Sequence, residues 1–186
     1  MRNGDAVRWL RRREITTGHL DRRGRGADPG NVRNSNPFGV LTVDDYLYVS
    51  NGGLNRLFKV DLDTGSYSEL AVFERIPNTS GLGGPPSVEA VPTGLAYSGG
   101  KVLVSLLSGG PFIPGLSRVK AVDPVTGAQS HFLTGLRTAI DVQPITGDGD
   151  TDYLVLENNF APAPPFPPTG ARHATELLRG TLVRVT

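Results

Sequence analysis

The sequence of 186 residues contains no cysteine. This absence excludes disulfide bonds, thiol catalysis and thiolate metal sites, but it identifies no cellular compartment. No apolar run approaches the roughly 18 residues that a membrane-spanning helix needs. The first residues also lack the apolar segment of a secretory signal, so the sequence predicts no signal peptide in this chain.

Charge is sparse and unevenly distributed, with 20% charged residues and a formal net charge of +1. Residues 1–33 contain nine arginines and four acidic residues, whereas residues 34–186 contain ten Lys and Arg against fourteen acidic residues. The larger part is mildly acidic, so we expect no nucleic-acid partner. We expect residues 1–33 to be a basic leader, either poorly ordered or a remnant of a preceding repeat unit. The alternative is a basic arm that contacts nucleic acid or a membrane surface.

Glycine (24) and proline (15) are abundant, and they punctuate a threefold repeat. The segment Pro37–Leu41 returns as Pro92–Ala96, and more weakly as Arg137–Asp141, at spacings of 55 and 45 residues. Each copy precedes an apolar strand and then a strand that alternates charged and apolar residues. A repeat of roughly 40 to 50 residues with several short strands is typical of β-propeller blades.

We therefore predict an all-β fold, a β-propeller fragment with two four-stranded antiparallel blades plus a partial third. The predicted blades span about residues 36–76, 91–134 and 136–186 of the propeller region 34–186. A propeller hides its sheet edges by closing into a ring of about four or more blades. We therefore expect a fragment of a longer protein, or a half-ring that self-associates through open blade edges.

Several short motifs in this chain resemble those of the ScyD/ScyE family, over about residues 28–186. The motifs are Ser35–Val40, Asn51–Gly53, Gly84–Pro86, Val91–Thr93, Phe112–Gly115 and Ser117–Val119. The resemblance implies part of a six-bladed propeller of the TolB/NHL type. It also implies an extracytoplasmic or secreted protein without assigned catalytic residues.

We expect a noncatalytic binding or scaffold domain, with loops 106–116 and 159–172 lining one face for a small molecule or a protein. No membrane partner is expected. The histidines His19, His131 and His173 do not accompany a Gly-x-Ser-x-Gly nucleophile motif, which is absent. The sequence therefore predicts no catalytic triad.

The alternative is a Ca²⁺-dependent hydrolase similar to the lactonase and paraoxonase propellers, which hold Ca²⁺ in the central tunnel with oxygen ligands. The strand-end side chains that could face such a tunnel are Asn36, Asn51, Asp141, Glu157 and Asn158. The competing interpretation is that these Asn and Asp residues cap turns at strand ends.

A second candidate calcium site is the segment 147–155, which resembles part of the FG-GAP and VCBS calcium loops. Asp148, Asp150 and Asp152 could surround one hard cation. The two earlier ligand positions of that pattern fall on Pro144 and Thr146, which are poor ligands. The alternative is an acidic hairpin turn, and Ca²⁺ is the only cofactor that the sequence indicates.

Overall fold

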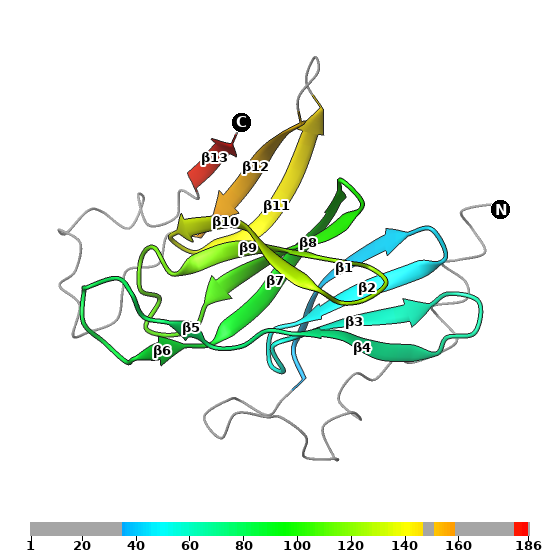
Figure 1. Cartoon of the computed structure of the whole chain (residues 1–186), viewed down its shortest axis with the longest axis horizontal. Helices are drawn as coiled ribbons and strands as arrows, with labels where there is room; N and C mark the ends of the chain where they lie inside the picture. Colours follow the sequence, from blue (N-terminus) through cyan, green and yellow to red (C-terminus); the bar gives the residue numbers. More distant parts are fainter. Residues whose placement is uncertain (1–34, 147–150, 159–180, 186) are drawn as a thin grey trace.

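The computed structural model describes residues 35–146, 151–158 and 181–185, and its architecture is all-β (Figure 1). No helix occurs in these ranges, and so none that could cross a membrane. Two four-stranded antiparallel sheets are followed by a three-stranded sheet. The predicted propeller fragment of two blades plus a partial third is confirmed. The predicted leader, residues 1–33, lies outside the described residues.

The strands of each blade pair in chain order, from the innermost strand outward. Blade one contains β1 (Pro37–Val43), β2 (Tyr46–Asn51), β3 (Arg56–Asp61) and β4 (Tyr67–Val72). Blade two contains β7 (Ala90–Ser98), β8 (Lys101–Ser108), β9 (Ser117–Val122) and β10 (Gln129–Leu136). The third sheet contains β11 (Ala139–Thr146), β12 (Thr151–Glu157) and β13 (Thr181–Val185). A short hairpin, β5 (Ile76–Pro77) and β6 (Ser87–Val88), lies in the connector between blades one and two.

The same turn joins the third and fourth strands of both complete blades. In blade one, Asp61 accepts hydrogen bonds from the backbone of Thr64 (2.8 Å), and Gly65 follows with a φ of 70°. In blade two, Asp123 accepts the equivalent bond from Thr126 (2.8 Å), and Gly127 has a φ of 72°. The Asp-x-x-Thr-Gly pattern forms this turn because the carboxylate satisfies the turn's N–H groups and glycine adopts positive φ.

The innermost strand of each of the three blade sheets contains an irregularity at the same place. The irregularity lies between Pro37 (opposite Asn51) and Val40 (opposite Val49) in blade one, and between Pro92 (opposite Leu106) and Leu95 (opposite Val104) in blade two. In the third sheet it lies between Ala139, opposite Glu157, and Asp141, opposite Leu156, after which Val142 pairs with Val155. This register makes Gly39, Gly94 and Asp141 equivalent.

The third copy of the repeat is offset from the position that the motif comparison indicates. That comparison aligns Arg137 with Pro37, whereas the strand pairing puts Ala139 at the Pro37 position. The pairing follows the apolar residues of β12, because burying one face of a strand specifies its register. A short motif without its glycine and proline carries too little information to do so.

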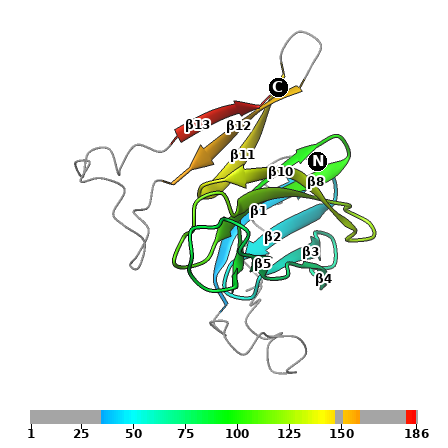
Figure 2. The ribbon, with the colours of Figure 1, turned by 60° about the vertical axis from the view of Figure 1, so that its left-hand side comes forward.

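Neighbouring blades pack face to face (Figures 1 and 2). Strand β7 contacts both β1 of blade one and β11 of the third sheet. Alternate residues of β8 point to opposite neighbours. Val102, Val104 and Leu106 belong to the core shared with blade one, and Leu103 belongs to the core shared with the third sheet. These apolar layers hold the blades in a fixed arrangement and thereby position the inner strands.

Candidate functional site

The inner strands β1, β7 and β11 line a groove of about 360 Å³. In a propeller the innermost strands surround the central channel, so this groove is the channel side of the three sheets. Its lining residues are Phe38, Gly39, Val40, Gly94, Leu95, Ile140, Asp141, Gln143 and Leu156. Phe38 is 60% exposed and Val40 is 69% exposed, so the groove presents an apolar surface to solvent.

Two glycines allow the walls of this groove to approach each other closely. A Cβ atom at Gly39 would lie 2.7 Å from the carbonyl oxygen of Thr93 in the next blade. A Cβ atom at Gly94 would lie 2.7 Å from the carbonyl oxygen of Ile140, again in the next blade. Both distances are below van der Waals contact, so the repeated glycine is required by the close approach of successive inner strands.

Asp141 is the predicted tunnel residue that lines the groove. It occupies the position that glycine holds in the two preceding blades, and its Oδ1 accepts a hydrogen bond from the backbone of Val142 (2.9 Å). The side chain lies against Gly94 and is half-buried. It places one carboxylate on an otherwise neutral surface.

Asn51 and Glu157 occupy equivalent positions at the ends of β2 and β12, where both are buried. Asn51 Oδ1 accepts hydrogen bonds from the backbone N–H groups of Asn36 (3.0 Å) and Leu54 (3.1 Å). Glu157 Oε1 accepts one from the backbone N–H of Arg137 (2.6 Å). These contacts are those of capping residues, and neither side chain is part of the groove lining.

Asn36 and Asn158, the remaining predicted tunnel residues, take part in matching backbone contacts. The carbonyl of Asn36 accepts a hydrogen bond from Gly52 N–H (2.8 Å), and Asn158 N–H donates to the carbonyl of Thr138 (2.9 Å). Asp141 therefore lines the groove, whereas the four strand-end residues form hydrogen bonds next to the first residues of β1 and β11.

The second candidate calcium site falls mostly outside the described residues, which include neither Asp148 nor Asp150. Asp152 lies in β12, where it pairs with Ile145 of β11 and is 7% exposed. Within the described ranges there is no group of three or more His, Asp and Glu side chains that could hold a metal ion. The calcium loop stays a prediction.

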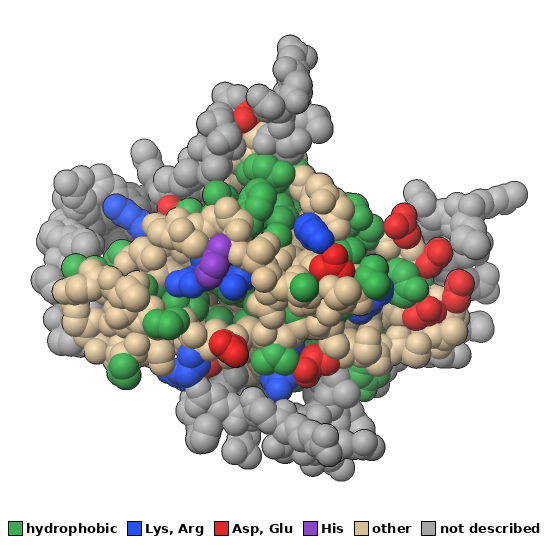
Figure 3. Space-filling model, viewed as in Figure 1, with side chains coloured by type: hydrophobic (Ala, Val, Ile, Leu, Met, Phe, Trp, Pro, Cys, Tyr) green, Lys and Arg blue, Asp and Glu red, His purple; other side chains and the backbone are tan. Residues whose placement is uncertain are grey.

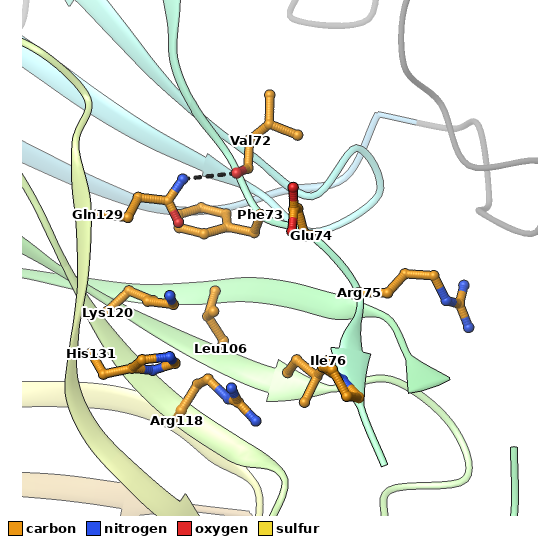
Figure 4. A pocket seen from close by; sticks show the side chains of 11 residues that line it. Val72, Phe73, Glu74, Arg75, Ile76, Leu106, Arg118, Lys120, Gln129 and His131 are labelled. Atoms are coloured by element: carbon orange, nitrogen blue, oxygen red, sulfur yellow. Dashed lines mark hydrogen bonds between the residues drawn. The ribbon is translucent and has the colours of Figure 1, made fainter. Parts of the chain in front are cut away.

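A second cavity of about 360 Å³ lies between blades one and two, and its lining is basic (Figure 4). Arg118 and Lys120 of β9 line it together with His131 of β10, and in the face shown in Figure 3 a purple histidine is flanked by blue cationic side chains. Segment 72–77, which runs from the last residue of β4 through β5, forms the other wall. We name this cavity the basic pocket.

The pKa values of Arg118, Lys120 and His131 are all lowered by burial, and those of Lys120 and His131 also by neighbouring positive charge. Burial lowers the pKa of Arg118, and burial together with the charge of Arg118 lowers the pKa of Lys120, although Glu74 partly opposes that shift. Burial lowers the pKa of His131 as well, and the charges of Lys120 and Arg118 lower it further. The pocket thus concentrates positive charge in a partly desolvated space.

Sequence reasoning missed the basic pocket. The alternation of Arg118 and Lys120 places both on one face of β9, but the same pattern also describes an ordinary solvent-facing strand. What makes it a pocket is the opposing segment 72–77, which comes from the preceding blade.

A search with protein-family models finds none that matches this chain, and no curated protein matches it.

Proposed function

We propose that this chain is a noncatalytic binding domain and that the groove along β1, β7 and β11 holds its ligand. The observation that carries the proposal is the exposure of Phe38 (60%) and Val40 (69%) on rigid inner strands. Leu156, at 40% exposure, extends the same apolar surface onto the third sheet. Apolar patches in a concave site mark binding surfaces, because covering them removes apolar area from water.

The ligand that fits this surface is a small molecule or a protein segment with an apolar face. Asp141 adds one carboxylate, which orients a ligand that also carries a hydrogen-bond donor or a cation. On the residues that resemble the ScyD/ScyE family, we propose that the domain belongs to a six-bladed propeller and acts outside the cytoplasm. Cell fractionation of the native host, with an antibody against this chain, tests the location.

The groove is tested with an environment-sensitive apolar dye such as anilinonaphthalene sulfonate, titrated into the full chain. We expect the substitutions Phe38→Ser and Val40→Thr each to reduce the dye's fluorescence enhancement. Val125→Thr is the matched control, since Val125 is 82% exposed in the turn after β9 and lies outside the groove. Circular dichroism confirms that each variant keeps its strand content. Equal dye binding by the parent and both groove variants would contradict the proposal.

Catalysis by the same groove is the competing outcome. A screen of lactones and esters with added Ca²⁺ measures it directly on the full chain. Turnover that Asp141→Asn abolishes would overturn the noncatalytic proposal in favour of the lactonase-like alternative.

A further inference from the structure

We propose that the basic pocket between blades one and two is a binding site for an oxyanion, of the sulfate or phosphate-ester class. This site lies on a different surface from the groove and goes beyond the function proposed above. It also lies entirely between the two complete blades.

Three side chains converge on the pocket from two paired strands (Figure 4). Arg118 and Lys120 are two residues apart on β9, and they therefore share one face of the sheet. His131 of β10 is the register partner of Lys120. The cavity between them and segment 72–77 has room for a tetrahedral oxyanion with part of the group that carries it.

The preceding blade shows what these sheet positions look like without a ligand site. The strand register makes Arg56, Phe58 and Glu69 of blade one equivalent to Arg118, Lys120 and His131 of blade two. In blade one, Arg56 Nε donates to Glu69 Oε2 at 2.5 Å, so the arginine has its own counter-ion.

Blade two keeps the arginine and changes both of its neighbours. Arg118 Nε donates to the carbonyl oxygen of Leu116 (3.2 Å), and Arg56 donates through Nη1 to the equivalent carbonyl of Leu54 (2.5 Å). A cation, Lys120, replaces the apolar Phe58, and His131 replaces the carboxylate of Glu69. The substitutions remove the counter-ion and add a cation in the same space.

The remaining charges near the pocket do not restore neutrality. No carboxylate in the described part of the chain lies within ion-pair distance of Arg118 or Lys120. Glu74 lines the pocket and is exposed. Arg75 lines it too, but its guanidinium pairs with Glu89 and donates to the hydroxyl of Ser87 (2.9 Å).

Two permanent cations therefore face one exposed carboxylate, with His131 able to add a third positive charge. Holding like charges together in a partly buried space is unfavourable unless an anion screens them. An oxyanion meets this need best, because an arginine guanidinium binds two of its oxygens and an ammonium supplies a point charge.

Binding of such an anion depends on pH through His131. The charges of Lys120 and Arg118 lower the pKa of this histidine in the free protein, and Glu74 and Arg75 are the other charged groups that line the pocket. A bound dianion opposes that repulsion, so it raises the pKa of His131. By linkage, affinity increases as the pH falls through the range where His131 gains its proton.

Sulfate is the probe for the test, because it remains a dianion throughout the pH range 5 to 8. Isothermal titration of the full chain at fixed ionic strength measures its affinity. NMR of the His131 ring follows the pKa with and without sulfate. We expect the His131 signal to shift on titration, its pKa to rise, and the affinity to increase toward pH 5.

The variants Lys120→Phe and His131→Glu place the blade-one residues in blade two. We expect each to weaken sulfate binding by about tenfold, as befits loss of a charge-assisted contact. Arg137→Gln is the control, because it removes one charge from an exposed residue outside the pocket and should leave the affinity unchanged. His131 is exposed, so its replacement leaves the core intact.

Two results would overturn the site. One is an unshifted His131 signal in the parent at saturating sulfate. The other is equal affinity in the parent, the two pocket variants and the control, which would show only a general effect of ions. If the chain binds the dye but not sulfate, the oxyanion site is wrong and the proposed groove is unaffected. If it binds sulfate but the groove variants do not change dye binding, the proposed groove is wrong and the oxyanion site is unaffected.

Discussion

The side-chain hydroxyl of Ser50 in β2 donates a 2.5 Å hydrogen bond to the carbonyl oxygen of Thr93 in β7 of the next blade. The same oxygen of Ser50 accepts a hydrogen bond from the backbone of Gly39 (2.8 Å). One serine thus joins two strands of its own blade and links them to the neighbouring blade. It lies at the bulge where glycine allows the inner strands to meet.

Replacing Ser50 with alanine should lower the free energy of unfolding by about 2 kcal/mol, since it removes the partner of a buried carbonyl and of a half-buried N–H. The matched control is Ser105→Ala. Ser105 has the equivalent position in blade two, and its hydroxyl has no hydrogen-bond partner within the described part of the chain. We expect that change to alter stability by less than about 0.5 kcal/mol. Chemical denaturation measures both, and equal losses would contradict the assigned role.

Replacing Gly94 with alanine should separate blade two from the third sheet. The added methyl group would lie 2.6 Å from the Cα of Asp141 and 2.7 Å from the carbonyl oxygen of Ile140, and backbone atoms cannot rotate away. We expect a loss of at least about 2 kcal/mol in the free energy of unfolding. Gly110→Ala, where a Cβ meets nothing within 4 Å, is the control. A stable Gly94→Ala protein would show that β7 and β11 do not approach as described.

Acid should weaken the fold through the carboxylates of the repeated turns. The Lys101 ammonium (2.7 Å), and then the N–H groups of Thr126 and Val125, hold the pKa of Asp123 well below its usual range. A depressed folded-state pKa contributes stability above about pH 4, and this contribution disappears as the pH falls through the folded value. We therefore expect the melting temperature of the parent to fall below about pH 4.

The variant Asp123→Asn should have a lower melting temperature than the parent at pH 7 and a flatter dependence on acid. Asp63→Asn removes the same charge from an exposed position in the first turn and should keep the parent's acid dependence. Thermal scans between pH 2 and 7 compare the three proteins. Identical acid profiles for the parent and Asp123→Asn would contradict the role of this turn.

Glu89 should stabilise the connector that leads into blade two. Its carboxylate pairs with the guanidinium of Arg75 and accepts a hydrogen bond from the side chain of Asn55 (2.5 Å), with 19% of the side chain exposed. We expect Glu89→Ala to lower the free energy of unfolding by about 2 kcal/mol, because it removes the carboxylate that binds the Asn55 amide and the Arg75 guanidinium in a mostly buried place. Glu69→Ala breaks a pair whose carboxylate is 45% exposed, so its cost should be below about 1 kcal/mol. Equal costs measured by denaturation would show that burial of Glu89 adds nothing.

The repeat in the sequence predicted the class of fold and the two complete blades with a partial third, because the residues that form each blade lie close together in the sequence. The Asp-x-x-Thr-Gly turns specify where the third and fourth strands meet, and apolar alternation specifies the strands. These signals lie within a few residues of one another, so a sequence contains them in full. Where the third unit lost its glycine, the motif aligned Arg137 with Pro37, and only the pairing of β11 with β12 showed that Ala139 belongs there.

The sequence proposed several strand-end residues for a tunnel site, and the structure gives them different surroundings. Asp141 lines the groove, whereas Asn51 and Glu157 turn their oxygens to backbone N–H groups. A strand-end polar residue has the same local pattern in both roles, and only the neighbouring chain decides which one it takes.

By itself, the sequence determined that this chain forms successive antiparallel blades, since strand alternation and turn chemistry are local properties. The tertiary structure alone decided which faces meet and which charges share a space. Arg118, Lys120 and His131 become a basic pocket because segment 72–77 of the preceding blade closes over them. Their equivalents in blade one, Arg56 and Glu69, neutralise each other within a single sheet. Electrostatic energy depends on distance through space and on the surrounding dielectric, and neither quantity can be obtained from the sequence without the tertiary structure.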